Sequence, residues 1–209
     1  MRLRGLYAIT PECADSAQLL ERAAEALAGG VVVLQYRSKQ ADAARRLREA
    51  RALAALCAAR DAVFIVNDDV ELAAAVNAHG VHLGRDDGDP AAARARLPRG
   101  LIGVSCYDQS QLARDAVACG ADYVAFGSVF TSPTKPGAVR APLALFGQAK
   151  PLGVPLAAIG GITLDNAPSL IAAGADLLAV ISDLFESPDV RARARAYAAL
   201  FDSRSTKPS

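Results

Sequence analysis

The stretch Ala118-Cys-Gly-Ala-Asp-Tyr-Val-Ala-Phe-Gly-Ser-Val-Phe130 contains the end of a helical pattern, a turn and an apolar strand. Gly120 stands where a helix favours a left-handed C-cap, and the β-branched and aromatic residues that follow are typical of a buried strand. The same joint recurs as Ala172-Ala-Gly-Ala-Asp176, and Gly29-Gly30 ends another helical pattern in the same way. A repeated helix-to-strand joint indicates a chain built from successive strand–helix units.

Short apolar runs alternate with helical patterns rich in Ala, Leu and Arg along the whole chain. The expected strands are Leu3–Thr10, Val31–Arg37, Ala62–Asp68, Gly80–Gly84, Leu101–Tyr107, Tyr123–Phe130, Pro155–Gly160 and Leu177–Ser182. The helical patterns that follow them are Ala14–Ala28, Ala41–Ala59, Val70–Ala78, Pro90–Leu97, Gln109–Cys119, Pro142–Lys150, Asp165–Ala173 and Pro188–Phe201. This alternation is typical of a parallel sheet covered by helices.

Units of this kind without a linker favour a closed barrel over an open sheet. We therefore predict an α/β fold, a single (β/α)8 TIM barrel domain over residues 1–202, followed by a tail at 203–209 that we expect to be disordered. The active site of such a barrel lies at the C-terminal ends of its strands.

Composition excludes several classes of function. The chain has 209 residues, 52% of them hydrophobic, and a net charge of +1 without a basic block, so nucleic acid is not an expected partner. Its four cysteines show no CxxC spacing, which argues against a zinc site and fits reduced thiols in the cytoplasm. From the apolar patterns we expect neither a signal peptide nor a membrane span. Small-molecule partners are expected, and the sequence leaves open whether the chain forms a homo-oligomer.

Polar and glycine residues mark the predicted strand exits. They are Gln35-Tyr-Arg-Ser-Lys39, Asn67-Asp-Asp69, Arg85-Asp-Asp-Gly-Asp89, Ser105, Thr131-Ser-Pro-Thr-Lys-Pro-Gly137, Gly160-Gly161 and Ile181-Ser182. The chain has only four lysines, and two of them, Lys39 and Lys135, lie at these exits. A lysine ammonium suits charge stabilisation beside a phosphate.

Two of the exits are acidic. Asp68 and Asp87 follow neighbouring strands, so their carboxylates are candidates to meet at one Mg²⁺, which accepts a few carboxylates together with water and phosphate oxygens. The alternative is helix capping by Asp68 or Asp69 and a solvated turn at Asp86-Asp-Gly-Asp89. The sequence does not decide which carboxylate of this last cluster is the ligand.

The seventh and eighth exits suit a phosphate, because Gly160-Gly161 and Ser182 lie where barrels often bind one through backbone N–H groups. Together the exits indicate two anionic subsites, one for a diphosphate with a metal and one for a monophosphate. No Ser-His-Asp order and no glutamate pair is present at the exits, so positioning and electrostatics would carry the rate, as in chemistry that expels pyrophosphate.

At these residues the chain closely resembles the thiamine-phosphate synthase family, from about Leu6 to Leu184. The matching segments follow one another in order, close to one for each strand. They are Leu6-Tyr-Ala-Ile-Thr, Gln35-Tyr-Arg-Ser-Lys, Asn67-Asp68, Gly80-Val-His-Leu-Gly, Ile102-Gly-Val-Ser, Ser132-Pro-Thr-Lys, Ala158-Ile-Gly-Gly-Ile-Thr and Ala179-Val-Ile-Ser.

The resemblance implies Mg²⁺-dependent condensation of hydroxymethylpyrimidine diphosphate with hydroxyethylthiazole phosphate, by a dissociative substitution that gives thiamine phosphate and pyrophosphate. It also implies the roles of individual residues. Those for the pyrimidine diphosphate are Gln35, Arg37, Lys39, Asn67, Ser105 and Lys135, with Lys39, Ser105 and Lys135 catalytic; those for the thiazole phosphate are Ser132, Thr134, Gly161, Ile181 and Ser182; those for the metal are Asp68 and Asp87.

Some positions depart from the family pattern. Arg85 stands where the family commonly has glutamine, Thr131 replaces a frequent proline, and Ser132 replaces a frequent threonine. His82 is interpreted as a hydrogen-bonded strand histidine rather than a catalyst. Two other functions stay open: a related thiazole tautomerase, and a barrel that binds thiazole phosphate or thiamine phosphate without catalysis. Neither needs the complete set of strand-exit lysines and carboxylates.

Overall fold

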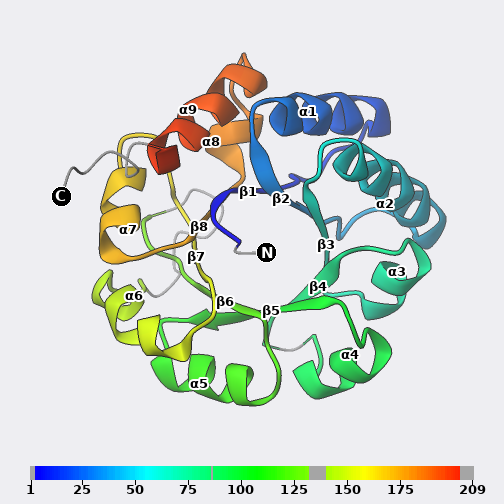
Figure 1. Ribbon diagram of the computed structural model, residues 1–209. Coiled ribbons are helices and arrows are strands. Elements are labelled where there is room, and N and C mark those ends of the chain that lie inside the picture. Colours follow the sequence, from blue (N-terminus) through cyan, green and yellow to red (C-terminus); the bar gives the residue numbers. More distant parts are fainter. Residues whose placement is uncertain (1–2, 86, 132–139, 203–209) are drawn as a thin grey trace.

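Parallel strands close into a barrel, in chain order, in the computed structural model, which describes residues 3–85, 87–131 and 140–202 (Figure 1). Every strand pairs in parallel with its two neighbours, and β1 pairs with β8. The strands are β1 Gly5–Ile9, β2 Val31–Tyr36, β3 Val63–Asn67, β4 Gly80–Leu83, β5 Leu101–Tyr107, β6 Tyr123–Phe126, β7 Leu156–Ile159 and β8 Leu177–Val180. The predicted barrel is confirmed.

Helices surround the barrel on its outer side (Figure 1). They are α1 Ser16–Ala28, α2 Ala43–Ala58, α3 Val70–Ala75, α4 Pro90–Arg96, α5 Ser110–Ala118, α6 Ala144–Ala149, the 3-10 turn Lys150–Leu152, α7 Ala167–Ala173, α8 Ser182–Phe185 and α9 Val190–Asp202. Two expectations were wrong in detail. Strand β6 ends at Phe126 instead of Phe130, and the short helix α8 follows β8 where we expected only a loop.

The repeated joint fixes where two strands begin. Asp122 donates its N–H to the carbonyl of Ile102, and its Oδ2 accepts the N–H of the same residue, both at 2.8 Å. Asp176 makes the same pair of bonds with Leu156, at 2.8 and 3.1 Å. Each aspartate therefore binds the start of its own strand to the preceding strand, which explains why the joint recurs.

The glycines at the helix ends serve two different purposes. Gly120 and Gly174 have positive φ angles of +93° and +112°, as the C-cap interpretation requires. Gly29 is different, because its φ is −89° and only Gly30 is left-handed, at +103°. A Cβ on Gly29 would lie 2.4 Å from the Cβ of Ala194, so glycine here permits the close approach of α1 and α9.

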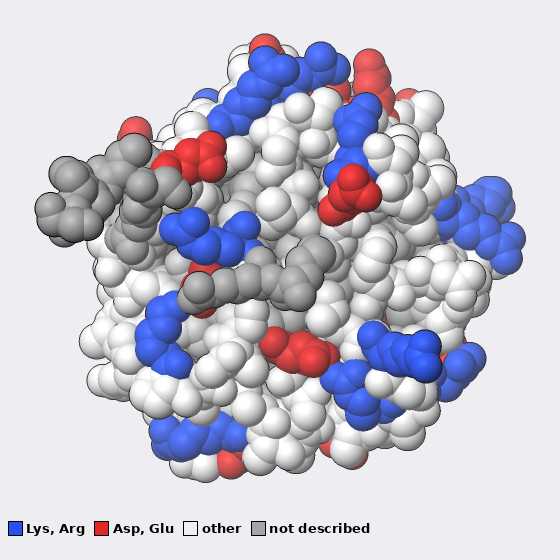
Figure 2. All heavy atoms as spheres, viewed as in Figure 1, with Lys and Arg blue, Asp and Glu red and all other residues white. Residues whose placement is uncertain are grey.

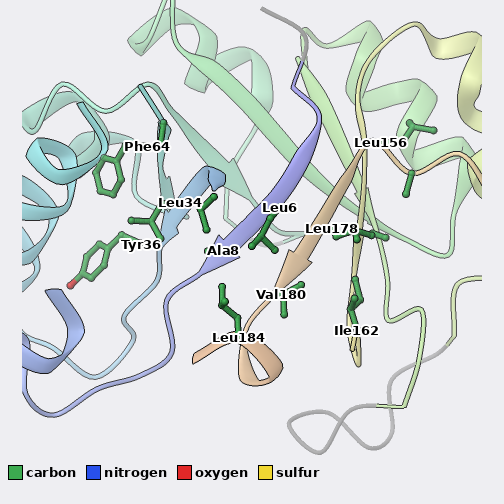
Figure 3. Close-up of a cluster of buried hydrophobic side chains, with 14 of the residues drawn as sticks. Leu6, Ala8, Leu34, Tyr36, Phe64, Leu156, Ile162, Leu178, Val180 and Leu184 are labelled. Atoms are coloured by element: carbon green, nitrogen blue, oxygen red, sulfur yellow. The ribbon is translucent and has the colours of Figure 1, made fainter. Parts of the chain in front are cut away.

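The core has two layers that follow the alternation of strand side chains. One layer lies between the strands and the helices and includes Leu6 and Ala8 of β1 (Figure 3). The other layer takes the opposite side of the same strand, Tyr7 and Ile9, and contains no helical residue, so it fills the barrel interior. The barrel is therefore packed with side chains, as in other folds of this class.

The surface shows no region of a single charge on the face drawn in Figure 2, where basic and acidic side chains are interspersed. This agrees with the net charge of +1. Within residues 3–85, 87–131 and 140–202, none of the helices has the length and apolar character needed to cross a bilayer.

Candidate active site

Lys39, Asp68 and Asp87 meet at the exits of β2, β3 and β4. Asp68 follows β3 directly in a left-handed conformation, with φ of +64°, and donates its N–H to the carbonyl of His82 at 2.8 Å. The Nζ of Lys39 lies 3.8 Å from Asp68 Oδ2. The backbone of β3 thus turns sharply at its end and presents the Asp68 carboxylate between its neighbours.

The Asp68 carboxyl is unusually easy to protonate. The pKa of Asp68 is raised to about 6, most of all by burial and further by a hydrogen bond with the facing Asp87 and by its negative charge. Lys39 and Arg37 oppose this rise in pKa without cancelling it. Two carboxylates that follow neighbouring strands therefore lie close together and repel each other, which favours binding of a proton or a cation between them.

The other aspartates of these two exits are helix caps. Asp69 Oδ1 accepts the N–H of Leu72 at 2.8 Å and caps α3, and Asp89 Oδ1 accepts the N–H of Ala91 at 3.1 Å and caps α4. Asp87 instead folds back on its own loop, where its Oδ2 accepts the N–H of Gly84 at 2.9 Å. Capping thus accounts for Asp69 and Asp89 and leaves Asp68 and Asp87; Asp86 lies outside the described residues.

Glu12, which the sequence reasoning did not select, holds the β2 exit in shape. Its Oε1 accepts the backbone N–H of Lys39 at 2.7 Å and lies 3.5 Å from Arg37 Nη1. Thr10 adds a second link, because its Oγ1 accepts the N–H of Arg37 at 2.9 Å. The polar segment after β1 was the signal that would have revealed these residues, since β1 exits beside β2.

Ser105 on β5 lies beside His82 on β4, with 2.9 Å between Ser105 Oγ and His82 Nε2. The other ring nitrogen of His82 lies 3.0 Å from the hydroxyl of Tyr123. Burial lowers the pKa of His82 to about 4, so the ring is neutral near pH 7. The interpretation of His82 as a hydrogen-bonded strand histidine is confirmed.

Arg85, the departure from the family pattern, binds to an aromatic ring at the next strand exit. Its guanidinium carbon lies 4.6 Å from the ring centroid of Tyr107, and its backbone N–H donates to the Tyr107 hydroxyl at 3.3 Å. A cation placed over an aromatic face is held there by the ring quadrupole. The added charge therefore lies over the Tyr107 ring at the end of β5.

The segment that follows β6 is hydrogen-bonded to the end of β7. Val129 and Phe130 donate their N–H groups to the carbonyls of Ile159 and Gly160, both at 3.0 Å. Gly161 has φ of +64°, and a Cβ there would lie 2.4 Å from the carbonyl oxygen of Thr131, so this approach requires glycine. The loop that follows contains Ser132, Thr134 and Lys135, three of the predicted site residues, and all three lie outside the described residues.

The remaining predicted residues also lie at strand ends. Asn67 is the last residue of β3, and its side chain is half-buried. Ile181 and Ser182 open helix α8, where their carbonyls accept the N–H groups of Phe185 and Glu186 at 2.9 and 2.8 Å. Gln35 differs, because it points into the barrel interior, is only 2% exposed, and donates to the hydroxyl of Tyr7.

Comparison with known proteins agrees with this arrangement. The family described as thiamine monophosphate synthase matches residues 6–184. The chain belongs to this family. It is 62% identical to the thiamine-phosphate synthase of Azoarcus sp. (strain BH72) over 202 residues, which cover 96% of this chain and 98% of that protein. It is 58% identical to the thiamine-phosphate synthase of Chromobacterium violaceum over 97% of this chain and 99% of that one.

Solved structures place the fold in the same family. The thiamine phosphate pyrophosphorylase of Pyrococcus furiosus is 33% identical, with a TM-score of 0.85 over 97% of both chains. A 3-hexulose-6-phosphate synthase has a TM-score of 0.70 at 20% identity, which shows a shared barrel only. As a member of the thiamine monophosphate synthase family, the protein is an enzyme of the transferase class.

Proposed function

We propose that this enzyme joins hydroxymethylpyrimidine diphosphate to hydroxyethylthiazole phosphate, giving thiamine phosphate and pyrophosphate with the help of Mg²⁺. The observation that carries the proposal is the facing pair Asp68 and Asp87 beside Lys39, in a chain of the thiamine monophosphate synthase family. A carboxylate pair next to an ammonium suits a metal–diphosphate complex, because the metal and the lysine both neutralise phosphate charge.

The acidic pair fits a divalent cation on chemical grounds. The two carboxylates do not cap helices, and their mutual repulsion helps to raise the pKa of Asp68 to about 6, so a cation between them would relieve that repulsion. Within the described residues, His, Cys, Asp and Glu form no cluster of three or more. Mg²⁺ commonly uses one or two carboxylates together with water and substrate phosphates, which matches this number. When bound, Mg²⁺ would neutralise charge on the departing diphosphate.

The proposed reaction is a dissociative substitution. The bond between the pyrimidine methylene carbon and the diphosphate oxygen breaks first, the pyrimidine amino group stabilises the resulting cation, and the thiazole nitrogen then attacks the carbon. The ammonium groups of Lys39 and Lys135 would stabilise the negative charge that develops on the leaving oxygen, and Ser105 would donate a hydrogen bond to that oxygen. Gln35, Arg37 and Asn67 would orient the pyrimidine diphosphate.

The thiazole phosphate would bind on the opposite side of the barrel mouth. Gly161 and the start of α8, Ile181 and Ser182, would supply backbone N–H groups there, and Ser132 and Thr134 would add hydroxyls. This division would keep the two anionic groups apart and would leave the thiazole nitrogen between them. A preorganised pair of subsites of this kind lowers the barrier by holding the reactants in line.

The direct test is to incubate the purified protein with both phosphorylated substrates, with and without Mg²⁺, and to follow thiamine phosphate and pyrophosphate. We expect equal amounts of the two products and a requirement for Mg²⁺. Thiazole isomerisation without condensation would assign the protein to the tautomerases instead. Tight binding of thiazole phosphate without any turnover would indicate a binding protein.

A further inference from the structure

A continuous chain of polar side chains crosses the barrel interior from Gln35 to Ser105. Gln35 Nε2 donates to the hydroxyl of Tyr7 at 2.6 Å, and the hydroxyls of Tyr7 and Tyr123 lie 2.8 Å apart. The Tyr123 hydroxyl lies 3.0 Å from His82 Nδ1, and His82 Nε2 lies 2.9 Å from Ser105 Oγ. The chain thus joins five strands and ends at a residue of the candidate active site.

The inner part of this chain is buried and closely packed. Tyr7 and Tyr123 are each 1% exposed and Gln35 is 2% exposed, so water has little access to the bonds among these three residues, whereas the last bond, between His82 and Ser105, is only partly buried. Gly103 on β5 makes room for the crossing, because a Cβ at this position would lie 2.0 Å from Cζ of Tyr123. The Tyr123 ring then stacks on His82, with centroids 5.6 Å apart. The backbone is therefore shaped to hold the chain together.

Proton accounting gives the chain a direction. Because the Gln35 amide nitrogen only donates, the Tyr7 oxygen accepts, and the proton of Tyr7 needs another acceptor. Within the described residues, the Tyr123 oxygen is the acceptor in reach. The opposite direction would leave the Tyr7 proton buried without a partner, which folded proteins avoid.

Each later step follows from the first. The Tyr123 hydroxyl donates a hydrogen bond to His82 Nδ1. The neutral ring therefore carries its proton on Nε2, and this N–H donates a hydrogen bond to Ser105 Oγ. Ser105 has then accepted one hydrogen bond, and its own O–H remains to be donated outward from the strand exit. A reversed Gln35 amide would invert the whole chain and turn Ser105 toward His82.

We propose that Tyr7, Tyr123 and His82 are positioning residues: together with the Gln35 amide they hold His82 as the Nε2–H tautomer, so that Ser105 presents its hydroxyl proton to the departing diphosphate. The last clause rests on the proposed function, whereas the direction of the chain does not. A serine oriented before the substrate binds needs no reorganisation in the transition state.

The tautomer is measured directly by nitrogen NMR of the full-length protein labelled with 15N-histidine. The chain has only two histidines, His79 and His82, so His79→Gln assigns both rings. We expect a neutral His82 protonated on Nε2 at pH 7. In Tyr7→Phe the first link is gone and Tyr123 can bond to His82 in either direction, so we expect a mixture of tautomers. A wild-type ring protonated on Nδ1 would overturn the proposal.

Kinetics then test whether the chain acts through Ser105. We expect Tyr7→Phe to lower kcat about fivefold, the value of roughly one hydrogen bond, with KM little changed. In a Ser105→Ala background the same substitution should cost nothing further, because its effect passes through the missing hydroxyl. Equal losses of kcat in both backgrounds would show a merely structural role and overturn the proposal.

Tyr36→Phe is the matched control. It removes the hydroxyl of another buried tyrosine, which donates to Glu49 at 2.6 Å on the outer side of β2, away from the chain. We expect the wild-type tautomer and kcat in this variant; a changed His82 tautomer would contradict the proposed route. If the wild-type protein shows the Nε2–H tautomer but condenses no substrates, the proposed function fails while the direction of the chain stands.

Discussion

Replacing Asp68 by Asn tests the acidic pair without catalysis. Asn has nearly the same shape, and it tolerates the left-handed backbone at φ of +64°, so the fold should be kept. Since the pKa of Asp68 is raised to about 6 in the folded protein, the stability that this group contributes is present at low pH and lost as pH rises through 6. The loss amounts to about 3 kcal/mol from the pKa alone. Because the side chain is 27% exposed, we expect about 1–2 kcal/mol after solvent screening.

The assay is urea unfolding of both proteins from pH 4 to pH 8 in the absence of divalent cations. Asp68→Asn should match the wild type near pH 4 and become more stable than it by about 1–2 kcal/mol at pH 8, which corresponds to a Tm difference of about 2–8 °C. Asp89→Asn is the control, because Asn also caps a helix and this position bonds to Ala91. Asp89→Asn should not reproduce the gain in stability at pH 8, because Asp89 caps α4 and is not part of the facing pair.

Magnesium completes this test. At pH 8, added Mg²⁺ should stabilise the wild-type protein by occupying the carboxylate pair, and it should stabilise Asp68→Asn much less. If the curves of wild type and Asp68→Asn stayed parallel from pH 4 to 8, the repulsion between Asp68 and Asp87 would be absent. If Mg²⁺ stabilised both proteins equally, the metal would bind elsewhere.

Three further predictions follow from the site and the barrel interior. Lys135→Ala should lower turnover about 100-fold or more in the condensation assay at saturating Mg²⁺, and near-normal rates would remove Lys135 from the mechanism. Gly103→Ala should lower the free energy of unfolding by about 1–3 kcal/mol, because its Cβ would lie 2.0 Å from Cζ of Tyr123; an unchanged urea midpoint would refute this packing. His82, whose pKa burial lowers to about 4, should make the wild type lose about 3 kcal/mol as pH falls from 6.5 to 4, since only the unfolded chain then takes up the proton. Urea titrations of His82→Gln should lack this loss.

The parts of the fold that the sequence predicted are those determined by local patterns. The Ala-x-Gly-Ala-Asp joints combine a cap, a turn and a strand start within a few residues, and both occur where expected. The pair Gly29-Gly30 supplies the predicted left-handed residue at Gly30, but the packing role of Gly29 was not foreseen, because it depends on Ala194, which is distant in the sequence. Helix α8 was missed for a different reason: a helix of four residues is too short to show a helical periodicity in the sequence.

The residues of the candidate site also fall into those that the sequence predicted and those that only the structure revealed. Strand-exit residues such as Asp68 and Lys39 were predictable, because a parallel barrel brings all its exits to one end. The link between Tyr7 and Tyr123 was not predictable, since the two residues are 116 positions apart and neither strand sequence indicates that the tyrosine hydroxyl forms a hydrogen bond inside the barrel. The alternatives at Asp69 and Asp89 needed the observed caps to be settled.

His82 connects the two halves of the proposed diphosphate site, one through its backbone carbonyl and the other through its ring. Its carbonyl accepts the N–H of Asp68 at 2.8 Å, which holds the sharp turn that presents one metal-side carboxylate. Its ring lies between Tyr123 and Ser105 and so orients the Ser105 hydroxyl that would donate to the diphosphate. A side-chain substitution at His82 leaves the carbonyl in place and disturbs only the ring contacts. We therefore expect His82→Gln to lower kcat through Ser105 while the Mg²⁺-dependent rise in Tm at pH 8 is retained, and loss of both would show that the two halves are coupled through the ring.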